Sequence, residues 1–247
     1  MTTVLRRFTD HKDAGEPYKL EQDHLAARLG TSLFRDGRLR SAKFADKAVL
    51  VSGHNNRKIG AVIQKGKWKG YPVFTLTLEE RATCPRSCLH WLDCYGNKMN
   101  WPTRWMADDD LIPTIGRNLS DLAREIPNFV IRLHVLGDFY SVAYVRQWAA
   151  WLDEFSGLHI YGYTAWQPGT AIGDSISTLA RNRWDRFAVR TSNGAVAERS
   201  TKTIYEATRS GDVDGGIVCP VQTGKTECCA TCALCWQTQQ RIVFLAH

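Results

Sequence analysis

The sequence predicts an α/β fold: an incomplete parallel β/α barrel with an N-terminal hairpin and a cysteine-rich C-terminal segment. Strand-like and helix-like runs alternate between residues 111 and 191, and the connections between them are short. Such alternation is typical of a parallel sheet. A complete eight-fold barrel takes about 250 residues, and this chain of 247 residues also carries terminal segments outside the alternation. We therefore expect a partial barrel.

The first elements form the predicted N-terminal part. One short amphipathic helix is expected within residues 25–34, where apolar residues recur at helical spacing. A strand at residues 48–52 precedes two strands at 59–64 and 71–78, which we expect to form a hairpin. Their connection, residues 65–70, combines glycines with lysines, as suits a turn.

The alternating part begins with a helix over residues 111–126, which Pro127 ends. Ser141 is the expected N-cap of the helix that follows it. The remaining predicted elements are a strand at 129–136, a helix at 142–155, a strand at 158–164, a helix at 172–180 and a strand at 186–191.

Charge divides the chain into two regions. Residues 1–70 hold 15 Lys and Arg against 7 Asp and Glu, although the whole chain carries only +7. We therefore expect residues 1–45 to form a basic, partly flexible arm, which could contact nucleic acid phosphates. Residues 46–247 are expected to form a single α/β domain, in which residues 211–237 are a cysteine-rich segment that binds a metal or a cluster.

The eight cysteines fall into two groups far apart in the sequence. The N-terminus lacks an apolar stretch long enough for a signal peptide, and no apolar run of about 18 residues or more occurs. We therefore expect a cytoplasmic protein without membrane contact, in which clustered thiols bind a metal rather than form disulfides. The first group is Cys84, Cys88 and Cys94, and the second group is Cys219, Cys228, Cys229, Cys232 and Cys235.

Ligand spacing favours an iron–sulfur cluster, with zinc as the alternative. Cys229, Cys232 and Cys235 repeat the two-residue spacing of ferredoxin-like cluster loops. Cys219, which precedes a proline, could complete that set of four, and Cys228 could then serve the first group. The gaps of three and five residues within the first group do not match a common zinc finger.

Three ways of dividing the ligands stay open at this level. Two four-thiolate sites could form, or one four-thiolate site could accompany a three-thiolate site with an open iron. Alternatively, one cluster could draw ligands from both groups. We expect [4Fe–4S] clusters, one or two in number.

Polar residues at the ends of the predicted strands indicate a ligand site. Ligands of parallel α/β folds collect at the carboxyl ends of the strands. Asp138, Thr164 and Asn193 follow or end three such strands, so we expect them to contact a bound ligand. His134 lies inside a strand and is expected to be a core residue, and His90, within the first group, is a weaker ligand candidate than the thiols.

Five motifs occur along the chain in a fixed order: Asn56-Arg57-Lys58-Ile59-Gly60, Thr83-Cys84-Pro85 with Cys88 and Cys94-Tyr95, Gly137-Asp138-Phe139-Tyr140-Ser141, Tyr163-Thr164-Ala165-Trp166, and Cys219-Pro220 with Cys232 and Cys235-Trp236. Together they resemble the phage "gene product 88" family over roughly residues 50–237. This resemblance implies a phage or prophage protein in the host cytoplasm, with a fold similar to the partial barrel of radical S-adenosylmethionine enzymes and with S-adenosylmethionine as a candidate ligand. Those enzymes usually separate their cluster cysteines by three and then two residues, whereas the second gap here is five.

The leading functional hypothesis is an iron–sulfur phage protein, either a redox enzyme or one similar to radical S-adenosylmethionine enzymes. The competing hypothesis is a non-enzymatic protein that zinc or a cluster stabilises. In that case the basic arm binds nucleic acid or a phage or host protein. No phosphate-binding glycine loop, nucleophile elbow or paired zinc-protease histidines occur in the sequence, so hydrolase functions have little support.

Overall fold

The computed structural model describes residues 18–45, 47–204, 213 and 215–246. Its centre is a five-stranded sheet with the strand order β2-β3-β5-β6-β7. β2 (Val51–Ser52) pairs antiparallel with β3 (Val73–Thr75), and all the other pairs are parallel. The parallel strands β5, β6 and β7 span Phe129–Leu133, Leu158–Thr164 and Phe187–Thr191. This mixed, unclosed α/β sheet confirms the predicted fold class.

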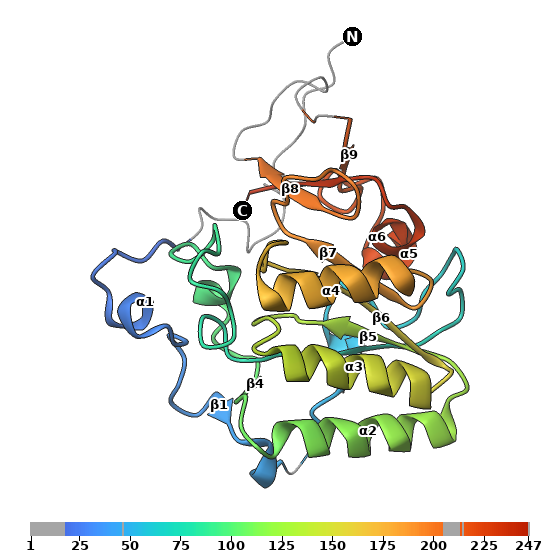
Figure 1. Ribbon diagram of the computed structural model, residues 1–247, viewed down its shortest axis with the longest axis horizontal. Coiled ribbons are helices and arrows are strands. Elements are labelled where there is room, and N and C mark those ends of the chain that lie inside the picture. The colour runs from blue at the N-terminus through green and yellow to red at the C-terminus, as the bar shows by residue number, and fades with distance from the viewer. Residues whose placement is uncertain (1–17, 46, 205–212, 214, 247) are drawn as a thin grey trace.

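Three helices cover one face of this sheet (Figure 1): α2 (Leu111–Glu125), α3 (Val142–Glu154) and α4 (Ala171–Asn182). Their apolar stripes face the strands because the apolar residues recur at helical spacing. The fully buried side chains between the helices and the sheet include Leu119, Ile131 and Trp148. The side chain of Ser141 accepts a hydrogen bond from the backbone N–H of Tyr144 at 3.1 Å, as expected for an N-cap.

The opposite face of the sheet is covered by the cysteine-rich segment. Its short helices α5 (Cys229–Cys232) and α6 (Leu234–Gln237) pack there together with residues from the turn between positions 59 and 71. Trp236 stacks on Trp68 with 5.4 Å between ring centroids, and both are buried. In a closed barrel this face would line the interior, so here the C-terminal segment fills the position of the barrel interior.

The predicted hairpin forms some of its cross-strand hydrogen bonds, but most of its residues are not in regular strands. Ile63 donates to the carbonyl of Tyr71, and Gly70 donates to the carbonyl of Ile63, but residues 59–64 form only an isolated antiparallel bridge at Val62. Of the predicted strand at 71–78, only β3 is regular. Pro72, which has no N–H to donate, limits the ladder at this point.

A small sheet near the C-terminus was not predicted. β8 (Thr201–Ile204), β10 (Ile242–Leu245) and β9 (Ile217–Val218) form it, and both of its pairings are parallel. Its strands are distant from one another in sequence, so no local sequence pattern predicts their pairing. Among the described residues, no helix is long and apolar enough to span a membrane.

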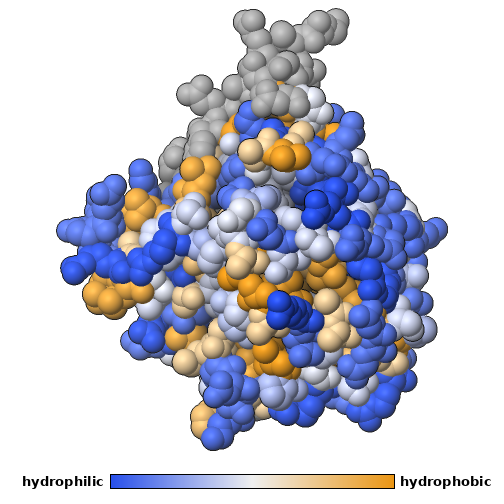
Figure 2. All heavy atoms as spheres, viewed as in Figure 1, coloured by the Kyte–Doolittle hydropathy of each residue, from blue (hydrophilic) through white to orange (hydrophobic). Residues whose placement is uncertain are grey.

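The described part of the basic arm packs beside the first cysteine group. It contains α1 (Leu25–Leu29), β1 (Leu39–Arg40) and a 3-10 turn, and β1 pairs in parallel with β4 (Arg104–Trp105). The outer side of α1 is apolar (Figure 2), since Leu25 and Leu29 are 64% and 59% exposed. Residues 1–17 of the predicted arm lie outside the described residues, so its predicted flexibility stays a prediction there.

Candidate functional site

The first cysteine group lies near the edge of the sheet where the parallel strands end. Burial raises the pKa of the Cys84 thiol well above its ordinary value, and the neighbouring charges of Asp138, Cys94 and Cys88 raise it further. Burial likewise raises the pKa of Cys88, and that of Cys94 to about 12. The three thiols therefore lie within electrostatic reach of one another and of a residue that follows β5.

A buried polar network holds the loop that carries this group. The Arg104 guanidinium donates to the Glu80 carboxylate at 2.7 Å, and both side chains are almost fully buried. Arg81 donates to the Asn97 carboxamide and, at 2.9 Å, to the carbonyl of Trp91. Because these groups would be costly to bury without partners, their hydrogen bonds stabilise the conformation of the loop.

Asp138 occupies the centre of this edge. Its backbone N–H donates to the Thr83 hydroxyl at 3.0 Å, and its carboxylate accepts from the backbone N–H groups of Phe139 at 2.8 Å and Ala165 at 2.6 Å. Gly137 precedes it with φ of +80°, and a Cβ there would lie 2.6 Å from the Thr83 hydroxyl oxygen. Segments that follow three strands thus meet at Asp138, two of them at its carboxylate and one at its backbone N–H.

Burial raises the pKa of Asp138 to about 7, against the lowering effect of hydrogen bonds from Ala165, Thr164 and Phe139. A carboxyl group in this state can change its charge near neutral pH. The Thr164 hydroxyl also accepts from the backbone N–H of Trp166 at 3.1 Å. Thr164 is therefore placed beside the carboxylate but is already engaged in local bonds.

Asn193 takes a different position from the other two predicted contacts. Its carboxamide oxygen accepts from the backbone N–H of Thr203 at 2.7 Å, which ties the end of β7 to β8. The Thr203 hydroxyl lies 3.3 Å from Nε2 of His90, whose Nδ1 is 3.2 Å from the Asp93 carboxylate. Asn193 is thus connected to the first cysteine loop through Thr203 and His90 rather than directly to Asp138.

The second cysteine group lies on the sheet face that α5 and α6 cover. The Tyr163 hydroxyl donates to Sγ of Cys235 at 2.9 Å, and Arg190 donates to the carbonyl of Cys235 at 2.8 Å. Burial raises the pKa of Cys229, with a further contribution from Cys235, and raises that of Cys219 to about 11. These thiols share one electrostatic neighbourhood.

Cations surround this second group. Burial lowers the pKa of Lys58, while the charges of the neighbouring Cys229, Cys219 and Cys235 raise it. The Arg132 guanidinium lies 4.6 Å from the ring centroid of Tyr163. A buried site rich in positive charge stabilises anionic groups such as thiolates.

One polar atom at this site lacks a partner. The hydroxyl of Tyr161 is buried and has no hydrogen bond to any described residue. Burial raises the pKa of this tyrosine well above its ordinary value, and nearby Cys229 raises it further. An unpaired buried hydroxyl next to thiols is suited to bond a group held by them, so the residues present fit a thiolate-bound centre.

The remaining thiols of the second group differ in their surroundings. Cys228 is the N-cap of α5, and its Sγ lies 3.6 Å from the Thr231 hydroxyl. A Cβ at Gly60 would lie 2.8 Å from the same sulfur. These contacts put Cys228 in the segment that carries the second group, and its role as a ligand of the first group stays a prediction. Burial also raises the pKa of Cys232, with Cys235 contributing.

The two groups approach each other through Lys58. Its carbonyl accepts from the backbone N–H of Cys229 at 2.8 Å, and its Nζ lies 5.5 Å from the ring centroid of Tyr95, the residue after Cys94. All eight cysteines are free thiols. Across the part of the chain that the structure describes, no three Cys, His, Asp or Glu side chains converge as ligands of one metal ion. Loading either group would therefore require its thiols to reorient, as is common where metal binding and folding are coupled.

Sequence reasoning missed the buried and half-buried charges around both groups. Arg132 and Arg190 interrupt apolar strand runs, and this interruption was a usable signal, because a charge in a buried strand needs a partner. Glu80 and Arg104 had no such signal, since the loop around them is irregular.

Comparison with known proteins gives one match. Residues 49–170 match the model of a family described as Gene product 88. The matched stretch contains β2, β3, β5, β6, the first cysteine group and Asp138, and it ends before the second group. No curated protein and no solved structure matches the chain.

Proposed function

We propose that the protein is a phage iron–sulfur protein with two separate cysteine sites. A three-thiolate site, formed by Cys84, Cys88 and Cys94, would hold a [4Fe–4S] cluster at the carboxyl edge of the strands. A four-thiolate site would hold a second cluster on the sheet face that α5 and α6 cover. Its ligands would be Cys219, Cys229, Cys232 and Cys235.

The observation that carries this proposal is the separation of eight free thiols into two groups with different surroundings. The first group adjoins the Asp138 carboxylate, and the second adjoins Lys58, Arg132 and Arg190. Cytoplasmic cysteines gathered in this way are more often metal ligands than structural thiols. The two-residue spacing in the second group favours a cluster over zinc.

The first site is the candidate for chemistry. Three cysteine ligands leave one iron of a [4Fe–4S] cluster without a protein thiolate, and such an iron can bind a small ligand. The cluster would supply one-electron chemistry there. Asp138 and Thr164 would then orient the ligand by hydrogen bonds at the strand ends. This arrangement supports a redox enzyme or one similar to radical S-adenosylmethionine enzymes, and S-adenosylmethionine is the small ligand to test first.

The experiment that tests this proposal measures iron, acid-labile sulfide and the visible spectrum of protein purified without oxygen. We expect a brown protein with about eight irons per chain, since each [4Fe–4S] cluster holds four. Cys84→Ala and Cys229→Ala should each remove about half of the iron. Cys228→Ala is the matched control and should retain all of it.

Three results would overturn the proposal. Tightly bound zinc in a colourless protein would replace the clusters with structural metal sites. Loss of all the iron in Cys84→Ala and in Cys229→Ala alike would instead favour one cluster shared by both groups. Retention of cluster content and fold in Cys84→Ala would remove the first site.

A further inference from the structure

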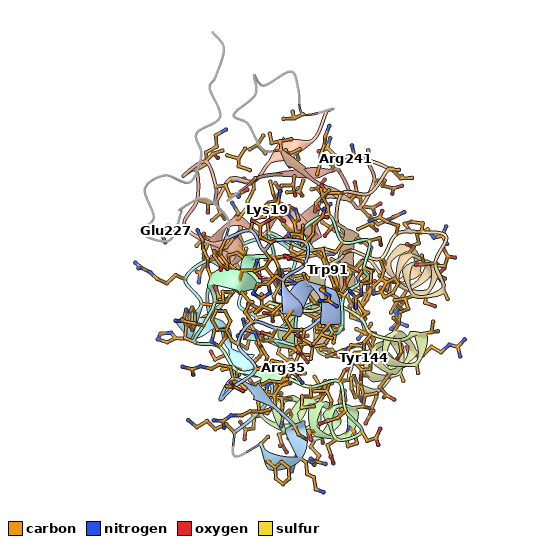
Figure 3. The ribbon with its side chains drawn as sticks, turned by 90° about the vertical axis from the view of Figure 1, so that its left-hand side faces the viewer. Lys19, Arg35, Trp91, Tyr144, Glu227 and Arg241 are labelled. Carbon is orange, nitrogen blue, oxygen red and sulfur yellow. The ribbon has the colours of Figure 1, made fainter. Side chains whose placement is uncertain are left out.

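A concave pocket of about 650 Å³ lies between α1 and the first cysteine loop. Small-molecule sites commonly span about 300–1,000 Å³. Figure 3 shows two of its lining residues, Lys19 and Trp91, beside α1. Leu89, Trp91 and Asp93 come from the stretch between Cys88 and Cys94, so one wall of the pocket is the cysteine loop itself.

Among the described residues, the lining of the pocket carries three cations and one carboxylate, so its net charge is positive. Lys19, Arg28 and Arg86 line it, and none of them forms an ion pair with a described residue. The acid in the lining, Asp93, has its carboxylate 3.2 Å from Nδ1 of His90. Three unpaired cations around a concavity focus a positive potential, which concentrates anions there.

One of these cations is fixed in place before any ligand arrives. The Arg86 guanidinium stacks on Trp91 at 4.9 Å from the ring centroid. Its Nη1 donates to the carbonyls of Ala27 at 3.1 Å and Arg28 at 3.0 Å, while its Nε and Nη2 have no hydrogen-bond partner among the described residues. A guanidinium held in this way binds an oxyanion with less loss of conformational entropy than a mobile side chain.

We propose that this pocket binds a small molecule that carries a phosphate monoester, with a nucleotide as the fitting size class. A phosphate monoester carries nearly two negative charges at neutral pH, which suits three cations better than a single carboxylate does. The apolar lining from Ala27, Leu89 and the Trp91 indole accommodates a sugar or a base beside the phosphate. This site is separate from the cysteine ligands and does not depend on the proposed clusters.

Occupation of the pocket acts on the cysteine loop. The pocket wall formed by Leu89, Trp91 and Asp93 is continuous in sequence with Cys88 and Cys94. α1 is attached to the same loop through Arg86 and through the Trp91 indole N–H, which donates to the carbonyl of Ala27 at 3.1 Å. A bound phosphate would bridge α1 and the loop and make this contact more rigid.

The test is isothermal titration calorimetry of the full chain, purified without oxygen, with adenosine monophosphate as the probe. We expect binding that adenosine alone does not reproduce and that inorganic phosphate reproduces weakly. Lys19→Gln and Arg28→Gln, both at exposed positions, should each weaken the binding about tenfold, as expected for one charge-assisted hydrogen bond. Lys69→Gln, an exposed lysine outside the pocket, is the matched control and should bind as the wild type does.

Three outcomes would overturn the inference. The first is absence of adenosine monophosphate binding at low salt. The second is equal weakening by Lys19→Gln and Lys69→Gln, which would show only nonspecific charge attraction. The third is tighter binding of a short single-stranded oligonucleotide without a terminal phosphate, which would assign the pocket to a nucleic acid backbone. None of these results bears on iron content, so failure here leaves the proposed clusters untouched.

Discussion

Arg104→Met should destabilise the protein more than the double variant Arg104→Met/Glu80→Leu does. The two side chains form an ion pair at 2.7 Å, at 0% and 1% side-chain exposure. Arg104 also donates to three backbone carbonyls within residues 96–102. The second carboxylate oxygen of Glu80 accepts from the Ser32 hydroxyl at 2.7 Å.

The size of the effect follows from what each variant leaves behind. Arg104→Met leaves a carboxylate buried with one hydroxyl partner, and breaking a buried pair in this way costs about 3–5 kcal/mol. Both variants leave the three carbonyls unpaired, but the double variant replaces the buried charge with an unpaired Ser32 hydroxyl, which costs about 1–3 kcal/mol. The second substitution should therefore recover about 2 kcal/mol of the free energy of unfolding.

Urea unfolding of all variants, prepared in the same way, measures this difference. Arg124→Met is the matched control, because Arg124 pairs with Asp121 on the surface at 72% and 61% exposure. Its loss should cost less than about 1 kcal/mol. The reasoning is refuted if the double variant is as unstable as Arg104→Met, since the buried charge would then not be the cause.

Three further predictions concern the core, the pH dependence and the arm. Burial lowers the pKa of His134 to about 3. The unfolded chain therefore binds a proton on this histidine near pH 6.5, whereas the native state does not. The free energy of unfolding should fall as the pH drops through this range. Between pH 6.5 and pH 5 this histidine should cost about 2 kcal/mol in urea unfolding, and His134→Gln should flatten that slope. Ile131→Ala, at a fully buried position between the sheet and its helices, should lower the unfolding free energy by about 2–5 kcal/mol in the same assay, and a smaller loss would indicate a loosely packed core. If the basic region binds nucleic acid, the wild type should bind DNA or RNA at low salt in a mobility-shift assay. Neutralising Arg38, Arg40, Lys43 and Lys65 should weaken this binding. Absence of binding by the wild type would rule out that function.

The sheet and its helices could be predicted because their signals are local. Residues 158–164 were predicted as a strand and form β6 with the same bounds, and Ser141 was recognised as an N-cap. The small C-terminal sheet could not be predicted in this way. Thr201–Ile204 pairs with Ile242–Leu245 across a long stretch of intervening chain, and short strands of this kind owe their stability to tertiary partners rather than to their own sequence pattern.

The meeting of Thr83, Asp138 and Ala165 at one edge was also predictable, because parallel strands place their carboxyl ends together. The role of Asn193 was not. Its φ of +51° and its hydrogen bond with Thr203 follow from the turn into β8, a strand that the sequence pattern does not predict. Spacing alone left Cys228 as a possible ligand of the first group, and its contacts with Thr231 and Gly60 could not be predicted from the sequence.

The filling of one sheet face determines how a small ligand could reach the cysteines. In a closed β/α barrel the inward strand residues form a packed core, and ligands bind above it at the carboxyl ends of the strands. Here those residues, such as Tyr161 and Ala188, pack against Trp236 and its neighbours from the C-terminal segment. Access from the barrel side is therefore blocked by protein. A ligand of the first cysteine group would have to enter at the strand ends, between Asp138 and the loop that α1 covers. The pocket beside α1 adjoins the outer side of that same loop, so the loop is the element through which a ligand bound there would affect the first group.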